Sequence, residues 1–343
     1  MMSESKILII YTGGTIGMIR DEVSGTLKPF HLKSVIKKIP SILKLGIELH
    51  AMELDEIIDS SNVTTETWIE LAEIIKDYYD DFDGFVVLHG SDTMAYSASA
   101  LSFLLENLAK PVIFTGSQLP IGLPRTDARE NLITALQIAA LRNSLGQPMI
   151  NEVCIYFEDK LYRGNRTHKF NSENFDAFLS LNYPILAEAG VRINVYEHRL
   201  LTQSKEELRV HTAMNTNVAV LKLFPGLNPA PLFNAYKTAG IKAVILESYG
   251  SGNGPTDNNF LHGIDELIRA KVLVTNITQC REGRVEMGKY ETSDALLNMG
   301  VLSGKDLTAE AAITKAMFVL GMDISYEESV ELMTTSLRGE MTT

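Results

Sequence analysis

The chain has 343 residues, with 31 Lys and Arg against 43 Asp and Glu, a formal net charge of −12 and a pI near 5.1. A nucleic-acid partner needs a concentrated basic face, and no run of Lys or Arg supplies one, so nucleic-acid binding is disfavoured. The apolar share of 45% can form a sizeable core in each of about two domains.

Near the N-terminus, five consecutive apolar or aromatic residues precede polar residues and glycines. This run is too short for a signal peptide or a membrane span, so we expect a cytoplasmic protein with no membrane segment. The two cysteines, Cys154 and Cys280, lie far apart in the sequence and predict neither a disulfide framework nor a metal knuckle. The seven histidines show no metal-ligand spacing, so we expect no metal.

Apolar runs of strand length then alternate with longer helical patterns, which is typical of a mostly parallel sheet with helices on both faces. Strands are predicted at 6–11, 47–54, 84–90, 110–116 and 151–157, and helical patterns at 32–46, 65–82, 95–108 and 128–143. A second group of runs, at 218–224, 242–250 and 271–279, is followed by helices that start near Thr308 and Tyr326.

The pattern changes from about residue 180, where the sequence becomes poor in strands and charged, with Pro184 and Gly190 interrupting it. We therefore predict an α/β protein with a larger N-terminal parallel-sheet domain and a smaller C-terminal α/β domain. The expected boundaries are 1–193 for the first domain, 194–214 for a linker and 215–343 for the second domain.

Four predicted strands end in polar residues and glycines, in the segments TGGT, DSSN, HGSDT and TGSQ. Ligands of open α/β sheets bind beyond the carboxyl ends of the strands, so these four ends are expected to meet at one site.

Three of the side chains near these ends could carry chemistry. Thr15 places a hydroxyl within a glycine-rich loop, and Ser91 and Asp92 stand where a strand passes into a helix. Helix capping is the simpler explanation of Ser91 and Asp92. Lys169 follows the strand-like run at 151–157, and lysine can activate a neighbouring hydroxyl when it is desolvated, although a solvated basic turn is the commoner role.

Other catalytic classes lack their signatures. No G-x-S-x-G elbow surrounds Ser91, so a serine hydrolase triad with His89 and Asp92 is disfavoured, and His89 is interpreted as a structural histidine. The glycines of TGGTIG fit neither G-x-G-x-x-G nor a P-loop, so a dinucleotide-binding oxidoreductase rests on fold class alone.

Taken together, the segments YTGGTIGM, HGSDTMAYSASALSF, KPVIFTGSQ, LYRGNRTHK, SYGSGN, NITQC and LRGE resemble type I (cytoplasmic) bacterial L-asparaginases, in family order and nearly end to end. The resemblance implies an L-asparagine amidohydrolase that forms a threonine acyl-enzyme. It also implies a homotetramer built from dimers, and it requires no metal or organic cofactor.

The resemblance assigns roles to individual residues. Thr15 is the implied nucleophile, and Ser91, Asp92 and Lys169 form a second set that orients the substrate and activates the attacking group. The implied substrate-binding residues are Asp59, Ser60, Ser61, Ser91, Asp92 and Ser117.

The chain departs from the family pattern at several positions. Ser91 replaces the usual threonine, keeping the hydroxyl but losing the methyl group that restrains χ1. The loop after the first strand lacks the tyrosine that many members carry, and Thr26 lies near the expected place. Tyr290 matches a tyrosine that some relatives supply from a neighbouring subunit, so we nominate it as a catalytic residue.

A further departure concerns regulation. Allosteric members bind a second asparagine at a site that includes an arginine and the segment TQC, which corresponds here to Thr278, Gln279 and Cys280. Glu247 stands in place of that arginine, and His168 replaces a threonine beside Lys169. A carboxylate cannot pair with the effector's carboxylate as guanidinium does, so we expect a weakened or absent effector response.

Two alternatives remain open. An amidotransferase or glutaminase-type enzyme would act on a related amide, and transfer-RNA-dependent relatives of that kind carry extra sequence before the first strand and a partner subunit. A catalytically silent amino-acid sensor would bind asparagine without releasing ammonia.

Overall fold

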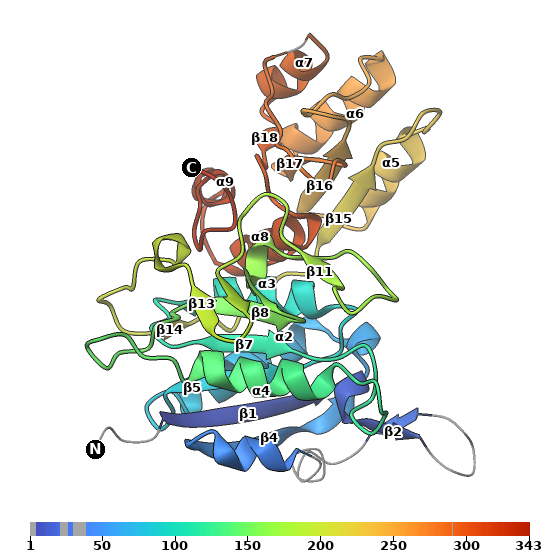
Figure 1. The fold of residues 1–343 in the computed structure, drawn as a ribbon. Helices are drawn as coiled ribbons and strands as arrows, with labels where there is room; N and C mark the ends of the chain where they lie inside the picture. Colours follow the sequence, from blue (N-terminus) through green and yellow to red (C-terminus); the bar gives the residue numbers. More distant parts are fainter. Residues whose placement is uncertain (1–4, 21–26, 30–38, 290) are drawn as a thin grey trace. The chain divides into compact units, whose positions relative to one another are not determined.

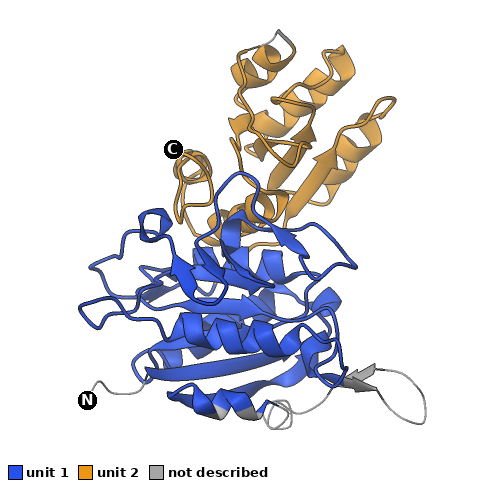
Figure 2. Cartoon of the chain, in the orientation of Figure 1, with its two compact units in different colours: residues 1–212 blue, residues 213–343 orange. Residues whose placement is uncertain are grey.

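A computed structural model describes residues 5–20, 27–29, 39–289 and 291–343. The chain divides into two compact units, residues 1–212 and 213–343 (Figure 2). The segment predicted as a linker, 194–214, contains strand β14 (Arg209–Val210), which pairs with β6 (Leu105–Glu106) within unit 1.

Unit 1 is built on an eight-stranded sheet with the order β13-β12-β9-β8-β7-β5-β1-β4. Strands β4, β1, β5, β7 and β8 are parallel, and β9, β12 and β13 continue the sheet with antiparallel pairing. Their bounds are β1 (Ser5–Gly13), β4 (Ile47–Ile58), β5 (Gly84–Leu88), β7 (Val112–Thr115), β8 (Val153–Phe157), β9 (Lys160–Arg163), β12 (Ala187–Ala189) and β13 (Ile193–Val195).

The central strands are continuous apolar runs because helices cover both of their faces. Every residue of β5, β7 and β8 is buried. Alternate residues of β1, Ile7, Ile9 and Tyr11, belong to one core cluster with the apolar side of helix α4 (Ala128–Ala139). Figure 1 shows α4 lying along these strands, while α2 (Thr65–Asp77) and α3 (Met94–Leu104) pack on each other and α3 packs on β8.

Short elements complete unit 1. These are the hairpins β2 (Met18–Arg20) with β3 (Leu27–Pro29) and β10 (His168–Lys169) with β11 (Phe178–Leu179), and the 3₁₀ turns η1 (Thr15–Gly17), η2 (Pro40–Lys44), η3 (Ser60–Asn62), η4 (Gly164–Arg166) and η5 (Glu197–Arg199). Of the helical pattern predicted at 32–46, residues 32–38 lie outside the described residues, and the rest contains η2.

Unit 2 carries a four-stranded parallel sheet with the order β15-β16-β17-β18. Its strands are β15 (Val218–Lys222), β16 (Ala243–Ser248), β17 (Leu273–Thr278) and β18 (Leu302–Ser303), and its helices are α5 (Ala230–Thr238), α6 (Asn258–Arg269), α7 (Glu291–Met299), α8 (Ala309–Gly321) and α9 (Tyr326–Thr334). Phe233 of α5 and Phe260 of α6 form a core with Val244, Leu246 and Val274 of the sheet.

In the described ranges, no helix combines the length and apolar character needed to cross a membrane.

A buried ion pair fixes the C-terminal segment of unit 2. Lys315 of α8 and Glu340 are both fully buried, with Nζ 2.6 Å from Oε1. Lys315 also donates to the Thr335 carbonyl, and Glu340 accepts the backbone N–H groups of Leu337 and Arg338. Each charge is therefore desolvated, and its partner must compensate for the lost hydration.

Replacing Lys315 by Met would leave the Glu340 carboxylate buried without a counter-charge. We expect Lys315→Met to lower the free energy of unfolding of the protein by about 3–5 kcal/mol, and the double variant Lys315→Met, Glu340→Gln to recover part of that loss. Urea-induced unfolding measures both. The matched control is Lys237→Met, which breaks the exposed Lys237–Glu266 pair of the same unit and should cost only a small fraction of the loss. Equal losses in the two single variants would contradict the expectation.

Candidate active site

Glycines bring the carboxyl ends of β1, β4 and β5 into backbone contact. A Cβ on Gly13 would lie 2.1 Å from the Ile58 carbonyl oxygen, and one on Gly14 would lie 2.5 Å from the Gly90 Cα. A Cβ on Gly90 would in turn lie 2.4 Å from the Ser60 hydroxyl oxygen. Gly13 and Gly14 also have φ values of 130° and 87°, which other residues rarely adopt. A side chain at Gly13 or Gly14 would have to displace the backbone of a neighbouring strand end, and one at Gly90 would have to displace the Ser60 side chain.

The end of β7 joins the same group. A Cβ on Gly116 would lie 2.4 Å from the His89 carbonyl oxygen, and the His89 N–H donates to the Thr115 carbonyl at 2.9 Å. The prediction that four strand ends meet at one edge of the sheet is therefore confirmed.

Thr15 begins the single turn η1 directly after this glycine pair. The Gly17 N–H closes the turn on the Gly14 carbonyl at 3.2 Å, and Thr15 itself is half-buried. The backbone directly before Thr15 thus lies against that of Gly90, the residue before Ser91.

Ser91, Asp92 and Lys169 form one hydrogen-bonded group. The Lys169 ammonium donates to the Ser91 Oγ at 2.9 Å and to the Asp92 Oδ1 at 2.5 Å. The Lys169 side chain is 16% exposed, whereas that of Asp92 is 67% exposed. The cation is therefore largely withdrawn from water, while its carboxylate partner still faces solvent.

A buried ion pair supports the segment that carries Lys169. Arg163, at the end of β9, donates from Nε to Glu152 Oε2 at 2.6 Å, and both side chains are at most 4% exposed. Arg163 also stacks on Tyr183 at 4.2 Å and donates to the Arg199 carbonyl. The turn η4 and Lys169 follow directly, so the position of the lysine depends on a rigid hairpin rather than on a free loop.

His89, two residues before Ser91, is a structural residue. Its Nδ1 lies 2.7 Å from the Gly90 carbonyl oxygen and its Nε2 lies 2.9 Å from the Ser97 Oγ. A carbonyl only accepts, so Nδ1 carries the proton and Nε2 accepts from Ser97, which in turn receives the Trp68 indole N–H at 2.9 Å. Burial lowers the pKa of His89 to about 4.

The residues expected to bind the amino-acid head lie at the end of β4. Asp59 accepts the Ser61 N–H at 2.9 Å and the Ser61 hydroxyl at 2.7 Å, and the backbone bond in particular lowers the pKa of Asp59. Ser60 is buried, and its carbonyl accepts the Thr93 hydroxyl at 2.7 Å. Asp59 is thus held as an anion beside the glycine contacts.

Ser117 and its neighbour Gln118 lie differently from each other. Ser117 is 2% exposed, and its hydroxyl donates to the Leu119 carbonyl at 2.7 Å. Gln118 instead reaches the Ser91 hydroxyl at 3.2 Å. Sequence reasoning missed Gln118, although its place after Ser117 at a strand end could have suggested it, because adjacent side chains at the end of a strand point in different directions.

The residues expected to bind an effector lie together in unit 2, at the carboxyl ends of β16 and β17. The Glu247 carboxylate pairs with the Lys222 ammonium at 2.9 Å. Gln279 donates to the Glu247 and Leu223 carbonyls, each at 2.7 Å, and the Thr278 hydroxyl donates to the Gly250 carbonyl. Cys280 is exposed.

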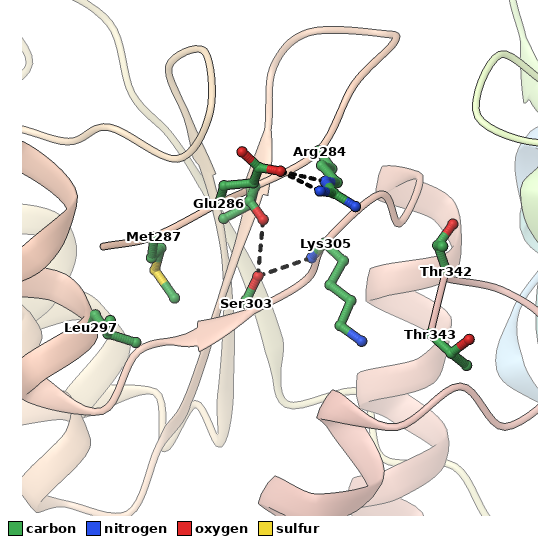
Figure 3. Close-up of a pocket in the computed structure, with 9 residues that line it drawn as sticks. Arg284, Glu286, Met287, Leu297, Ser303, Lys305, Thr342 and Thr343 are labelled. Atoms are coloured by element: carbon green, nitrogen blue, oxygen red, sulfur yellow. Dashed lines mark hydrogen bonds and ion pairs between the residues drawn. The ribbon is translucent and has the colours of Figure 1, made fainter. Parts of the chain in front are cut away.

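Thr26 and Tyr290 lie outside the described residues. Within the described ranges, no group of three or more His, Cys, Asp or Glu side chains is arranged to hold a metal ion. Unit 2 contains a pocket of about 320 Å³. Its lining includes Lys305 and the Arg284–Glu286 pair as well as the apolar side chains of Met287 and Leu297 (Figure 3). None of the predicted site residues lines this pocket.

The neutral state of His89 predicts a pH dependence of stability. The pKa of His89 is about 4 in the folded state and near 6.5 when unfolded, so between these values the unfolded state binds the extra proton. Its contribution to the free energy of unfolding is therefore present at pH 7 and is lost on acidification, by about 3 kcal/mol at pH 4.

Urea unfolding at pH 7 and pH 4.5 should show a smaller acid loss in His89→Gln than in the wild type. The control is His262→Gln, at an exposed histidine of α6, which should keep the acid loss of the wild type. An acid loss in His89→Gln as large as that of the wild type would contradict this assignment.

Comparison with known proteins matches two family models in the order of the two units. The model described as "Asparaginase, N-terminal" covers residues 6–201, and "Glutaminase/Asparaginase C-terminal domain" covers residues 217–333. L-asparaginase 1 of Escherichia coli K12 is 42% identical over 99% of both chains. The crystal structure of L-asparaginase I from Vibrio cholerae is similar with a TM-score of 0.89 and 38% identity, over 99% of this chain and 100% of that one. The thermostable L-asparaginase from Thermococcus kodakarensis is similar with a TM-score of 0.90 and 32% identity, over 98% and 99%. With both of its units matched and the strand-end arrangement described above, this chain belongs to the asparaginase family.

Proposed function

We propose that the protein is a cytoplasmic L-asparaginase that hydrolyses L-asparagine to L-aspartate and ammonia, with Thr15 as the nucleophile. The observation that carries the proposal is the contact of Lys169 with both Ser91 and Asp92, on the strand end whose backbone touches the Thr15 loop. The relatives named L-asparaginase support the choice of substrate.

In the first step, the Thr15 hydroxyl oxygen attacks the side-chain amide carbon of asparagine. The C–N bond breaks, the hydroxyl proton ends on the leaving nitrogen, and ammonia departs from an aspartyl ester of Thr15. A threonine hydroxyl is a poor nucleophile near neutral pH and needs a partner that accepts its proton. We assign that proton transfer to the Ser91, Asp92 and Lys169 group.

In the second step, water attacks the ester, and the same group accepts a proton from the water and returns one to the Thr15 oxygen. Dividing amide hydrolysis into two steps lowers each barrier. The negative charge on the carbonyl oxygen requires donors fixed in advance, and the backbone N–H groups around Ser91 are suited to this, each worth on the order of 3 kcal/mol.

The amino-acid head of the substrate is assigned to Asp59, Ser60 and Ser61. The lowered pKa of Asp59 keeps its carboxylate ionised near neutral pH, so that it can attract the α-ammonium group of asparagine. Ser117 is assigned a place near the reacting amide. Since its hydroxyl donates to the Leu119 carbonyl, it would offer the substrate its oxygen as an acceptor.

Two further assignments rest on the family resemblance. We propose a homotetramer made of two dimers, and we propose that Tyr290 assists the nucleophile of a neighbouring subunit. A glutaminase or amidotransferase activity, and a sensor without turnover, are the alternatives that the assay below separates from asparaginase.

Removing the Thr15 hydroxyl should abolish turnover without unfolding the protein. We expect ammonia release from L-asparagine by Thr15→Val to fall on the order of a thousandfold or more, since a nucleophile is lost. Ammonia is measured from L-asparagine and, in parallel, from L-glutamine. The control is Thr238→Val, which removes an exposed hydroxyl from α5 and should leave the rate unchanged.

The outcomes separate the candidate functions. Faster release from L-glutamine would favour a glutaminase. A folded wild type that binds L-asparagine, seen as a rise in melting temperature, but releases no ammonia would favour a sensor. Retained turnover in Thr15→Val would exclude Thr15 as the nucleophile.

The Lys222–Glu247 pair predicts the shape of the velocity curve. Because Glu247 occupies the place of the effector-binding arginine and pairs with Lys222, the Lys222 ammonium is already neutralised by a carboxylate of this chain and is a weaker partner for a second asparagine carboxylate. We expect a hyperbolic dependence of initial velocity on asparagine concentration, in the wild type and in Lys222→Met alike. A sigmoidal curve in the wild type would contradict this.

A further inference from the structure

Gln118 bridges two parts of the candidate site. Its side-chain oxygen Oε1 lies 3.2 Å from the Ser91 Oγ, and its side-chain nitrogen Nε2 lies 3.0 Å from the Asn174 carbonyl oxygen. Asn174 belongs to the turn between β10, which carries Lys169, and β11. The half-buried Gln118 amide therefore joins Ser91 to the β10–β11 hairpin that carries Lys169.

The orientation of this amide follows from its partners. A backbone carbonyl can only accept a hydrogen bond, so the Asn174 oxygen requires the NH₂ group of Gln118. The oxygen of Gln118 must then face Ser91. An amide oxygen also only accepts, so the Ser91 hydroxyl proton points toward Gln118.

The same logic fixes the direction of the next bond. With its proton directed to Gln118, the Ser91 oxygen offers a lone pair to the Lys169 ammonium, 2.9 Å away. The chain of donors therefore runs from Lys169 through Ser91 to Gln118. Asp92 receives a second proton of the ammonium at 2.5 Å, so the protonated lysine has two acceptors in this arrangement.

The backbone at Gln118 is itself held in place. The Asp127 carboxylate, at the N-terminus of α4, accepts the N–H groups of Gln118 and Leu119 at 2.9 and 3.1 Å. On the far side of the bridge, the Asn171 side chain accepts the N–H groups of Glu173 and Asn174 at 2.8 and 3.0 Å, which stiffens the turn. The backbone at each end of the bridge is thus held in place, and the Gln118 side-chain amide joins the two ends.

We infer that Gln118 is a positioning residue: it sets the direction of the hydrogen bonds along Lys169 and Ser91, and it fastens the 171–176 turn beside the site. The catalytic consequence rests on the proposed function. Because Ser91 lacks the methyl group of a threonine, its χ1 is less restrained by its own structure, and the bond to Gln118 supplies that restraint.

The anchoring role is tested first, with a measurement that needs no activity. Hydrogen–deuterium exchange is followed in the wild type, Gln118→Met and Gln118→Glu, where neither substitute can donate to the Asn174 carbonyl. We expect amides of residues 171–176 to exchange at least fivefold faster in both variants. Gln147→Glu, at an exposed turn glutamine, is the control and should match the wild type. Unchanged exchange in both Gln118 variants would overturn the anchoring role.

The directing role is tested by pH–rate profiles of ammonia release from L-asparagine. Gln118→Glu places a negative charge beside the Ser91–Lys169 pair, and a nearby negative charge makes that pair hold its proton more tightly. The part of the pH–rate profile that reports proton loss from this pair should therefore move to higher pH by about one unit. Gln118→Met adds no charge, so it should lower kcat about tenfold with little change in KM and without that movement of the profile.

The two measurements separate the possible failures. A wild type that releases no ammonia would refute the proposed function while the exchange data still decide whether Gln118 anchors the turn. An active enzyme in which kcat and the pH profile of both Gln118 variants equal those of the wild type and of Gln147→Glu would overturn the directing role.

Discussion

The structure of the site depends on the close approach of backbone to backbone at the carboxyl ends of four strands. Gly14 rests on Gly90, and Gly90 rests on the Ser60 side chain, with distances that leave no room for a Cβ. Neighbouring strands of a sheet are already spaced by about 4.8 Å, but loops with side chains would spread apart beyond the last ladder bond. Glycine removes that obstacle. The two loops that carry Thr15 and Ser91 are consequently in backbone contact without a bound substrate, which reduces the ordering that binding at this place would need.

The cation of the site comes from outside this parallel arrangement. Lys169 follows the antiparallel hairpin of β8 and β9, in which the buried Arg163–Glu152 pair replaces the hydration of both charges. Such a pair is a weak source of stability but constrains geometry, because each partner must stay within reach of the other. His89 constrains the geometry in a similar way without charge, since its neutral ring donates a hydrogen bond to the Gly90 carbonyl.

The sequence was sufficient to predict the parallel strands and the residues at their ends, because buried parallel strands are continuous apolar runs and their polar tips are easily seen. It did not predict β9, β12 and β13, which are three or four residues long and pair antiparallel at the edge of the sheet. Strands this short lack a periodic pattern. Gln118 was missed for another reason: its place at a strand end could have suggested it, but its importance comes from a tertiary contact with Ser91. The expected roles of Thr26 and Tyr290 stay predictions from the resemblance.

In the second unit, the strand register shows which side chain lies beside Glu247. Glu247 alone, read along the chain, is only a carboxylate where relatives of the allosteric type have arginine. In the sheet, Lys222 and Glu247 are register partners on the adjacent parallel strands β15 and β16, so their side chains leave the same face side by side. An arginine at 247 would lie beside this lysine and concentrate positive charge at the strand ends, whereas glutamate cancels the charge of the lysine internally. The prediction of a weakened effector response therefore rests on two neighbouring residues, because the carboxylate of Glu247 both replaces the arginine and neutralises the lysine beside it.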